Sequence, residues 1–239
     1  MNFDGKVFLE ALTSKSLIQG VQLTIALTVV SFVVGLLIGL LMALMRDSRV
    51  PLLRWLSWTY VWIFRGIPTL IQLFIVWFAL PQVFPALREP WFTPFLAATI
   101  ALAFNEAAYA AEILRGGLLA VDEGQRLAAR ALGMPPFKVF SKVVAPQLTR
   151  VTIPPMANDF ITLLKITSLA SVTSLRELMT NTQAAVSSSF RFAEWYGAAA
   201  IYYLVLVSIF MVGQSWLERR YVWTSQARGP RSLMRAIGR

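Results

Sequence analysis

Apolar residues occur in long runs along this chain, instead of the short periodic stripes that cover a soluble core. A transmembrane helix needs about 20 consecutive, mostly apolar residues. Five stretches come near that length, and they lie at residues 25–45, 66–84, 95–113, 151–175 and 196–217. We therefore expect an all-α integral membrane protein with five transmembrane helices and with its two termini on opposite sides.

Two of these runs carry a local signal. In the first, Gly35 and Gly39 form a G-x-x-x-G pair, which allows another helix to approach closely. This run is too long for a signal peptide, and no A-x-A cleavage site follows it. The fourth run begins with Pro154 and Pro155, so we expect both prolines in the first turn of its helix, where proline is tolerated.

Residues 50–64, just before the second run, place three tryptophans on one helical face. Trp55, Trp58 and Trp62 recur at i, i+3 and i+7. Tryptophan favours the headgroup level of a bilayer. The segment is either a helix that lies along or enters the interface, or the start of one long, tilted second helix.

Composition supports the membrane assignment and narrows the chemistry. The chain is 57% apolar and 14% charged, against about 45–50% and about 25% in soluble domains. It has no His and no Cys, which excludes His–Cys zinc sites, Ser-His-Asp triads, thiol nucleophiles and disulfides. A membrane-embedded enzyme would have to use carboxylates, Lys, Ser or Tyr, and the G-x-S-x-G nucleophile motif is absent.

A net charge of +10 is compatible with binding to nucleic acid, but the positions of the basic residues indicate how the chain is oriented in the membrane. Residues 46–54, 115–150 and 218–239 together hold fifteen basic and four acidic residues. The three alternate connections hold five of each sign. By the positive-inside rule the N-terminus lies outside and the C-terminus inside, and no nucleic-acid partner is expected.

The connection at residues 115–150 is unusually long for a linker. Residues 124–132 favour a helix, Gly133 can end it in a left-handed conformation, and Pro136 can start another. This pattern predicts a helix–turn–helix on the cytoplasmic face, which is either an ordinary surface hairpin or a docking element.

Four stretches of the chain resemble one family of transporters. The long loop is similar to the "EAA" loop of ABC importer permeases, at Gly124, Ala128, Ala129, Leu132, Gly133, Val143 and Pro146. FRGIPTLIQLF at 64–74, AAYAAEILRGGL at 107–118 and LLKITSLASV at 163–172 resemble segments of the polar amino acid permeases of the histidine/glutamine type. The four matches occur in the order and with the spacing of that family.

The resemblance implies a type I ABC importer permease of the bacterial inner membrane, which moves a polar amino acid. It implies three kinds of partner: a dimer of ATP-binding subunits, a second permease subunit, identical or paralogous, and a periplasmic or extracellular solute-binding protein. The chain has no G-x-x-x-x-G-K-[ST] phosphate loop, so ATP hydrolysis is expected in a separate subunit and no cofactor in this one. The alternatives are a permease for an amino acid derivative or opine, and an autonomous channel or carrier.

Two positions depart from the family pattern. The signature Glu of the loop, which is thought to contact the ATPase, is Leu127 here. The Asp that usually follows the Lys of the fourth motif is Ile166. The charged ATPase contact and a simple Lys–Asp pair are therefore missing.

Ionisable groups within the runs mark a candidate substrate pathway, because each costs about 2.5–3.5 kcal/mol to place at the membrane centre. We expect Glu106 and Lys165 to match in depth, with Glu106 for the ammonium group and Lys165 for the carboxylate of a zwitterion. The alternative is a buried ion pair that only fixes helix packing. The candidate pathway residues are Asn105, Glu106, Tyr109, Lys165, Thr167 and Ser168.

A second group of motif residues is expected to be structural. Arg65, Gly66, Pro68 and Gln72 stand at the expected cytoplasmic entry of the second span, where Gly-x-Pro breaks a helix and Gln72 can bond across helices. Glu112 and Arg115 have the spacing of an ion pair. Residues 1–217 are expected to form one membrane domain, and residues 218–239 a basic tail that binds anionic lipid.

Overall fold

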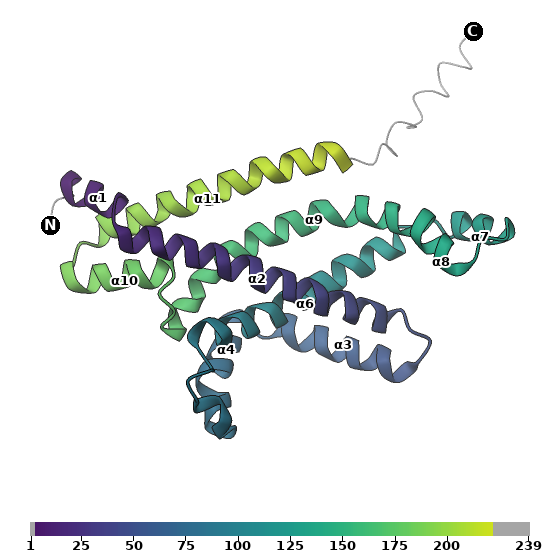
Figure 1. Ribbon diagram of the computed structural model, residues 1–239, viewed down its shortest axis with the longest axis horizontal. Helices are drawn as coiled ribbons and strands as arrows, with labels where there is room; N and C mark the ends of the chain where they lie inside the picture. The colour runs from purple at the N-terminus through teal and green to yellow at the C-terminus, as the bar shows by residue number, and fades with distance from the viewer. Residues whose placement is uncertain (1–2, 222–239) are drawn as a thin grey trace, which may run out of the picture.

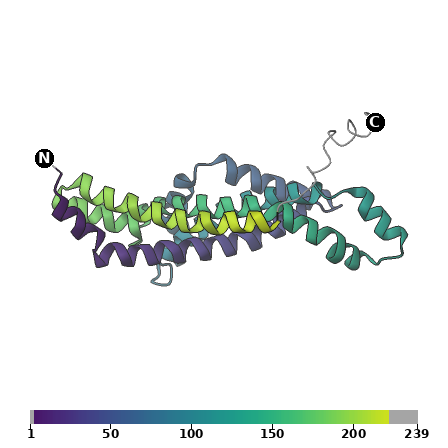
Figure 2. The same ribbon diagram turned by 90° about the horizontal axis from the view of Figure 1, so that it is seen from above.

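A computed structural model describes residues 3–221, and every regular element among them is a helix. Four long helices run side by side along the long axis of the molecule (Figure 1). They are α2 (Lys15–Arg46), α6 (Pro94–Leu119), α9 (Ala145–Ile166) and α11 (Phe192–Tyr221). The N-terminus lies at one end of this bundle, and a helical hairpin projects from the other end (Figure 2).

Helices α2 and α6 make the most extensive helix contact among the described residues, along a line that we call the α2–α6 seam. A Cβ atom added at Gly35 would lie 2.7 Å from Cγ of Glu106, and one added at Gly39 would lie 2.7 Å from Cβ of Ala110. The two backbones approach this closely because the glycines have no side chain and α6 presents alanines there. The packing role predicted from G-x-x-x-G is confirmed.

The chain breaks sharply after α3 (Pro51–Gly66). Ile67 is extended, as the residue before Pro68 must be, and the following helical stretch leaves at 102°. That stretch consists of α4 (Thr69–Phe74), the π-helical η1 (Ile75–Ala79) and α5 (Leu80–Val83), with the 3-10 turn η2 (Pro85–Arg88) after it.

Helix α3 packs into the bundle. The Ser57 hydroxyl donates to the carbonyl of Met42 in α2 (2.8 Å), and the Tyr60 hydroxyl donates to that of Phe104 in α6 (2.6 Å). Residues 50–64 therefore do not start one continuous tilted helix, because the chain bends by 102° after them, and their position along or entering the membrane interface stays a prediction.

The fourth helix has different bounds from those expected. It begins at Ala145 with Pro146 in its first turn, so Pro154 and Pro155 lie inside it, and their predicted first-turn position was wrong. It continues an almost unbroken helical run from α8 (Pro136–Val139) and the π-helical η3 (Phe140–Val144). It ends at Ile166, where the 3-10 segment η4 (Thr167–Thr173) follows.

Two short helices cover the N-terminal end of the bundle. They are α1 (Gly5–Leu12) and α10 (Leu178–Ser189), and the second lies within a stretch expected to be a loop. The carboxylate of Glu177 caps α10 by accepting from the backbone N–H groups of Met179 (2.8 Å) and Thr180 (2.6 Å). The Asn181 amide ties α10 to the carbonyl of Ser16 (2.8 Å).

Within residues 3–221, α2 and α11 are each long and apolar enough to cross a membrane, and α3 with residues 69–83 passes the same test as a bent pair. Helices α6 and α9 do not pass this test of length and hydropathy, because polar side chains interrupt their apolar runs. The count of five spans and their orientation stay predictions. The predicted tail lies mostly outside the described residues, except for its first part on α11.

Candidate functional site

A pair of carboxyl groups lies where α2, α6 and α9 meet. Glu106 is 4% exposed and packs against Gly35 of the α2–α6 seam. Its carboxyl group lies beside that of Asp159 on α9. Oε1 of Glu106 and Oδ2 of Asp159 are buried, and within the described residues they have no partner other than the neighbouring carboxyl group. A buried acid beside a half-buried one, with oxygens that no donor from another residue reaches, favours a cation or a donated hydrogen bond at this place.

Arg65 acts on Asp159, and Tyr109 lies beside Arg65. The Arg65 guanidinium attracts the charge of Asp159, and its Cζ lies 5.3 Å from the centroid of the Tyr109 ring. Both side chains also line a half-polar cavity of about 450 Å³, together with Arg46 and Glu112. The Glu106–Asp159 site, as we call Arg65, Glu106, Tyr109 and Asp159, therefore presents acidic, basic and aromatic groups within one region.

Asn105 and Gln72 hold the break after α3 against α6. The Asn105 amide donates to the carbonyl of Phe64 (3.1 Å), and the Gln72 amide donates to those of Phe64 (2.9 Å) and Ile67 (2.8 Å). These bonds satisfy carbonyls that the helix break leaves free. The predicted break at Gly66 and Pro68 and the cross-helix role of Gln72 are confirmed.

The hydrogen bond from Asn105 places Phe64 level with the middle of α6. Arg65 and Gly66 follow it and are exposed at the surface of the described residues, and their predicted position at the cytoplasmic entry of a span stays a prediction.

The structure does not bring Lys165 to Glu106. Lys165 is exposed in the last turn of α9, and it forms no ion pair within residues 3–221. The Thr167 and Ser168 hydroxyls donate to the carbonyls of Leu164 (2.6 Å) and Lys165 (2.7 Å) and so serve the end of their own helix. The expected match in depth failed because α9 starts six residues before the apolar run, which moves its centre toward Asp159.

The sequence analysis assigned no role to Asp159, although it lies within the fourth apolar run. The available signal was an acid in an apolar run with no basic residue three or four positions away.

The long connection forms the predicted hairpin. Helix α7 (Glu123–Ala131) is followed by Gly133 at φ 75° and then by α8. The Gly124 N–H donates to the Asp122 carboxylate that caps α7 (2.6 Å). Ala129 is buried against the second arm, whereas Ala128 and Pro146 are exposed. The helix–turn–helix and the left-handed glycine are confirmed.

The outer face of this hairpin is apolar and unusually open. Leu127 is 56% exposed, Phe137 78% and Leu132 82%. The hairpin stands clear of the bundle, at the end away from the N-terminus (Figures 1 and 2). Where α6 leads toward it, Arg115 and Glu112 form the predicted ion pair (3.2 Å).

A helix bundle with charged groups in its interior and an apolar hairpin at one end has the architecture of a membrane transport subunit. Residues 35–223 match the family described as binding-protein-dependent transport system inner membrane component. The chain belongs to this family, and it is an ABC transporter permease of the inner membrane, a transport subunit.

Individual relatives agree with the family assignment. The chain is 38% identical to the probable amino-acid permease protein YxeN of Bacillus subtilis, over 85% of this chain and 90% of that protein. It is 40% identical to the octopine transport system permease protein OccM of Rhizobium radiobacter, over 81% of each. A crystal structure of an amino acid ABC transporter with histidines matches 92% of this chain and 100% of its own, at 33% identity and a TM-score of 0.83. The predicted type I importer fold and the recognised family are confirmed.

Proposed function

We propose that this permease moves a polar amino acid and binds it at the Glu106–Asp159 site. One observation carries the proposal: two acids meet between α6 and α9, no donor from any other described residue reaches their buried oxygens, and Arg65 attracts the charge of Asp159. The substrate ammonium binds between the two carboxyl groups, and its carboxylate binds Arg65. Tyr109 flanks the substrate, and Asn105 positions the break that holds Arg65. Relatives that are amino acid and octopine permeases support this class of substrate.

Uptake by the reconstituted transporter tests the site. We expect Glu106→Gln combined with Asp159→Asn to raise KM for the transported amino acid at least tenfold, because both acceptors for the ammonium group are lost. Basal ATPase activity should stay within twofold. Glu112→Gln is the matched control, since Glu112 pairs with Arg115 outside the carboxyl pair. Unchanged uptake kinetics in the double variant would rule the site out.

ATP hydrolysis belongs to separate subunits in this proposal, and the hairpin at residues 115–150 receives them. Its exposed leucines and Phe137 supply apolar surface for burial, and the chain has no phosphate loop of its own. A second permease subunit completes the pathway, and an external binding protein delivers the substrate. The permease should co-purify with an ATPase and support ATP-dependent uptake; uptake without ATP would contradict the scheme and favour an autonomous carrier.

The proposed topology has five spans, with the N-terminus outside and the C-terminus inside. It rests on the one-sided basic loops and on the hairpin lying at the end of the bundle opposite the N-terminus. The chain lacks native cysteine, so single cysteines report their side directly. An impermeant thiol reagent outside intact cells should label Ser188→Cys and not Ser141→Cys. The reverse labelling would invert the topology.

A further inference from the structure

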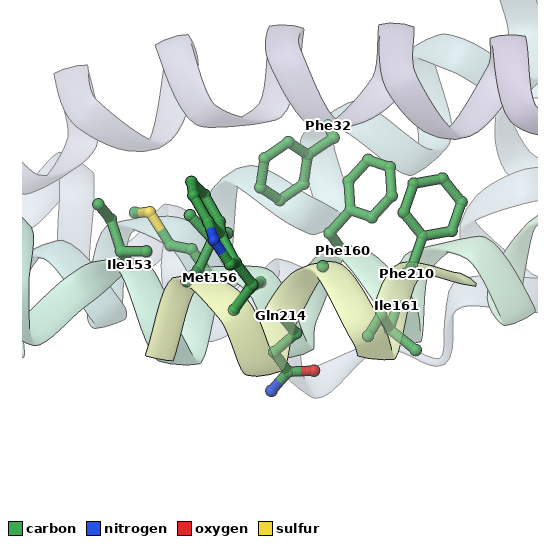
Figure 3. A pocket seen from close by; sticks show the side chains of 11 residues that line it. Phe32, Ile153, Met156, Phe160, Ile161, Phe210 and Gln214 are labelled. Atoms are coloured by element: carbon green, nitrogen blue, oxygen red, sulfur yellow. The ribbon is translucent and has the colours of Figure 1, made fainter. Parts of the chain in front are cut away.

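An apolar groove separate from the Glu106–Asp159 site lies between α2, α9 and α11. Its volume is about 530 Å³, and apart from Gln214 its lining is apolar. Three rings gather at one end, where Phe160 lies 5.1 Å from Phe32 and 4.9 Å from Phe210 between ring centroids (Figure 3). Ile153 and Met156 line the other end.

The groove has the length of one bilayer leaflet. Its lining on α9 runs from Ile153 to Ile161, which at about 1.5 Å per residue is about 12 Å. That is close to half of a hydrocarbon core of about 30 Å. In the proposed topology the ring cluster lies toward the bilayer midplane, and the end lined by Ile153 and Trp216 lies toward the membrane surface on the side of the C-terminus.

That end of the groove is basic. The Arg220 guanidinium lies 5.6 Å from the ring centroid of Trp216, which itself lines the groove. Arg150 precedes Ile153 by three residues and so shares its face of α9. Among residues 3–221, no acid forms an ion pair with Arg150, Arg219 or Arg220. The nearby acid, Glu218, accepts a hydrogen bond from Gln214 instead (2.9 Å).

We infer that this groove binds an anionic phospholipid of the cytoplasmic leaflet. One acyl chain lies along Met156 and Phe160 and ends at the ring cluster, and the phosphate lies between Arg150 and Arg220. A chain of one leaflet's length, with an apolar body and an anionic head, matches both the lining and the charge of the groove. The leaflet assigned to this lipid rests on the proposed orientation.

Gly213 provides a direct test, because it lines the groove and a Cβ atom there would meet nothing within 4 Å. The complete transporter, purified in detergent, is titrated with phosphatidylglycerol or with phosphatidylcholine of the same chains, and bound lipid is counted by native mass spectrometry. We expect Gly213→Leu to fill the groove and weaken binding of both lipids at least tenfold. The matched variant Gly213→Ala should bind like the wild type.

A second pair of variants separates the headgroup from the chain. Arg150→Gln with Arg220→Gln should weaken phosphatidylglycerol about tenfold and leave phosphatidylcholine unchanged. Equal binding by the wild type and Gly213→Leu would overturn the proposal, as would equal affinity of the wild type for the two lipids.

Two other occupants would also overturn it, and each has its own signature. If residues 222–239 fill the groove, the wild type binds no lipid and a chain ending at Tyr221 does. If a second copy of the chain covers the groove, Gly213→Cys forms a disulfide-linked pair in the membrane. ATP-dependent uptake, measured in parallel, tests the transport function by itself, since lipid binding needs neither the Glu106–Asp159 site nor a substrate.

Discussion

The α2–α6 seam and the hairpin formed by α7 and α8 both depend on small residues, yet they use them in opposite ways. At the seam, a Cβ atom added to Gly35 or Gly39 would lie within 2.8 Å of α6 side chains. At the hairpin, a Cβ atom added to Gly133 would meet nothing, and the glycine is needed for its φ of 75°. Gly35 and Gly39 allow α2 and α6 to pack closely, whereas Gly133 forms the turn of a hairpin whose apolar outer face stays exposed.

This difference distinguishes a motif that packs two helices of the same chain from a motif that we expect to contact a partner protein. G-x-x-x-G and the Gly124–Gly133 spacing look alike as strings of small residues. The structure distinguishes them. The glycines of G-x-x-x-G are packed against α6 within residues 3–221, whereas the hairpin around Gly133 leaves the side chains of Leu127, Leu132 and Phe137 exposed. Substitutions at the two places should therefore fail at different stages, assembly of the permease or its coupling to ATP.

Gly39→Leu should have the largest effect. Overpacking a close contact costs about 1–3 kcal/mol or more, and here the contact is with Ala110 and the backbone of α6. We expect loss of most of the folded permease, measured as monodisperse protein after detergent extraction. Gly116→Leu on α6 is the control, because a Cβ there meets nothing within 4 Å. Equal yields of the two variants would show that the seam is not closely packed in the membrane.

Gly133→Trp should leave the permease folded and abolish ATP-dependent uptake. The left-handed conformation costs a residue with a Cβ about 1–2 kcal/mol, which distorts the turn between α7 and α8 and not the bundle. Gly133→Asn is the matched variant, since Asn tolerates this conformation, and it should keep most of the uptake. Normal uptake by Gly133→Trp would mean that the hairpin does not couple ATP hydrolysis to transport.

Leu127→Ala should weaken binding of the ATPase about tenfold. Burying a leucine side chain contributes about 1.5–3 kcal/mol, and truncation removes most of that apolar contact. Affinity between separately purified permease and ATPase, measured in detergent, is the readout. Leu9→Ala removes an equally exposed leucine at the opposite end of the molecule and should change nothing. If both variants bind alike, Leu127 lies outside the docking surface.

Much of the fold could be predicted because its signals are local. Apolar run length located α2, α6 and α11, and glycine and proline located the hairpin turn and the break after α3. The bounds of α9 could not be predicted from hydropathy. Its first two turns are polar enough to look like a loop, and they are helical because they continue α8 and η3.

Only part of the candidate site could be predicted, because the sequence marks polar residues within a span but not the residues that they contact. Glu106 and Asn105 were recognised as polar groups within a span, but their partners depend on helix register. A start of α9 at Ala145 instead of residue 151 brings Asp159 to Glu106 and leaves Lys165 in the last turn. No local pattern records which face of α9 meets α6, because that contact is set by packing against α2 and α11 as well.

Glu112 and Arg115 should show the smallest effect, and they lie at the end of the α2–α6 seam that is nearer to the hairpin. Their ion pair spans 3.2 Å, and its side chains are 25% and 38% exposed. Partly exposed pairs of this kind contribute about 0–1 kcal/mol. We expect Glu112→Gln, Arg115→Gln and the double variant to shift the melting temperature of the purified permease by a few degrees at most. The double-mutant cycle should give a coupling below about 0.5 kcal/mol. A coupling several times larger would mean that charges, and not only the glycines and alanines of the α2–α6 seam, hold this end of α6 in place.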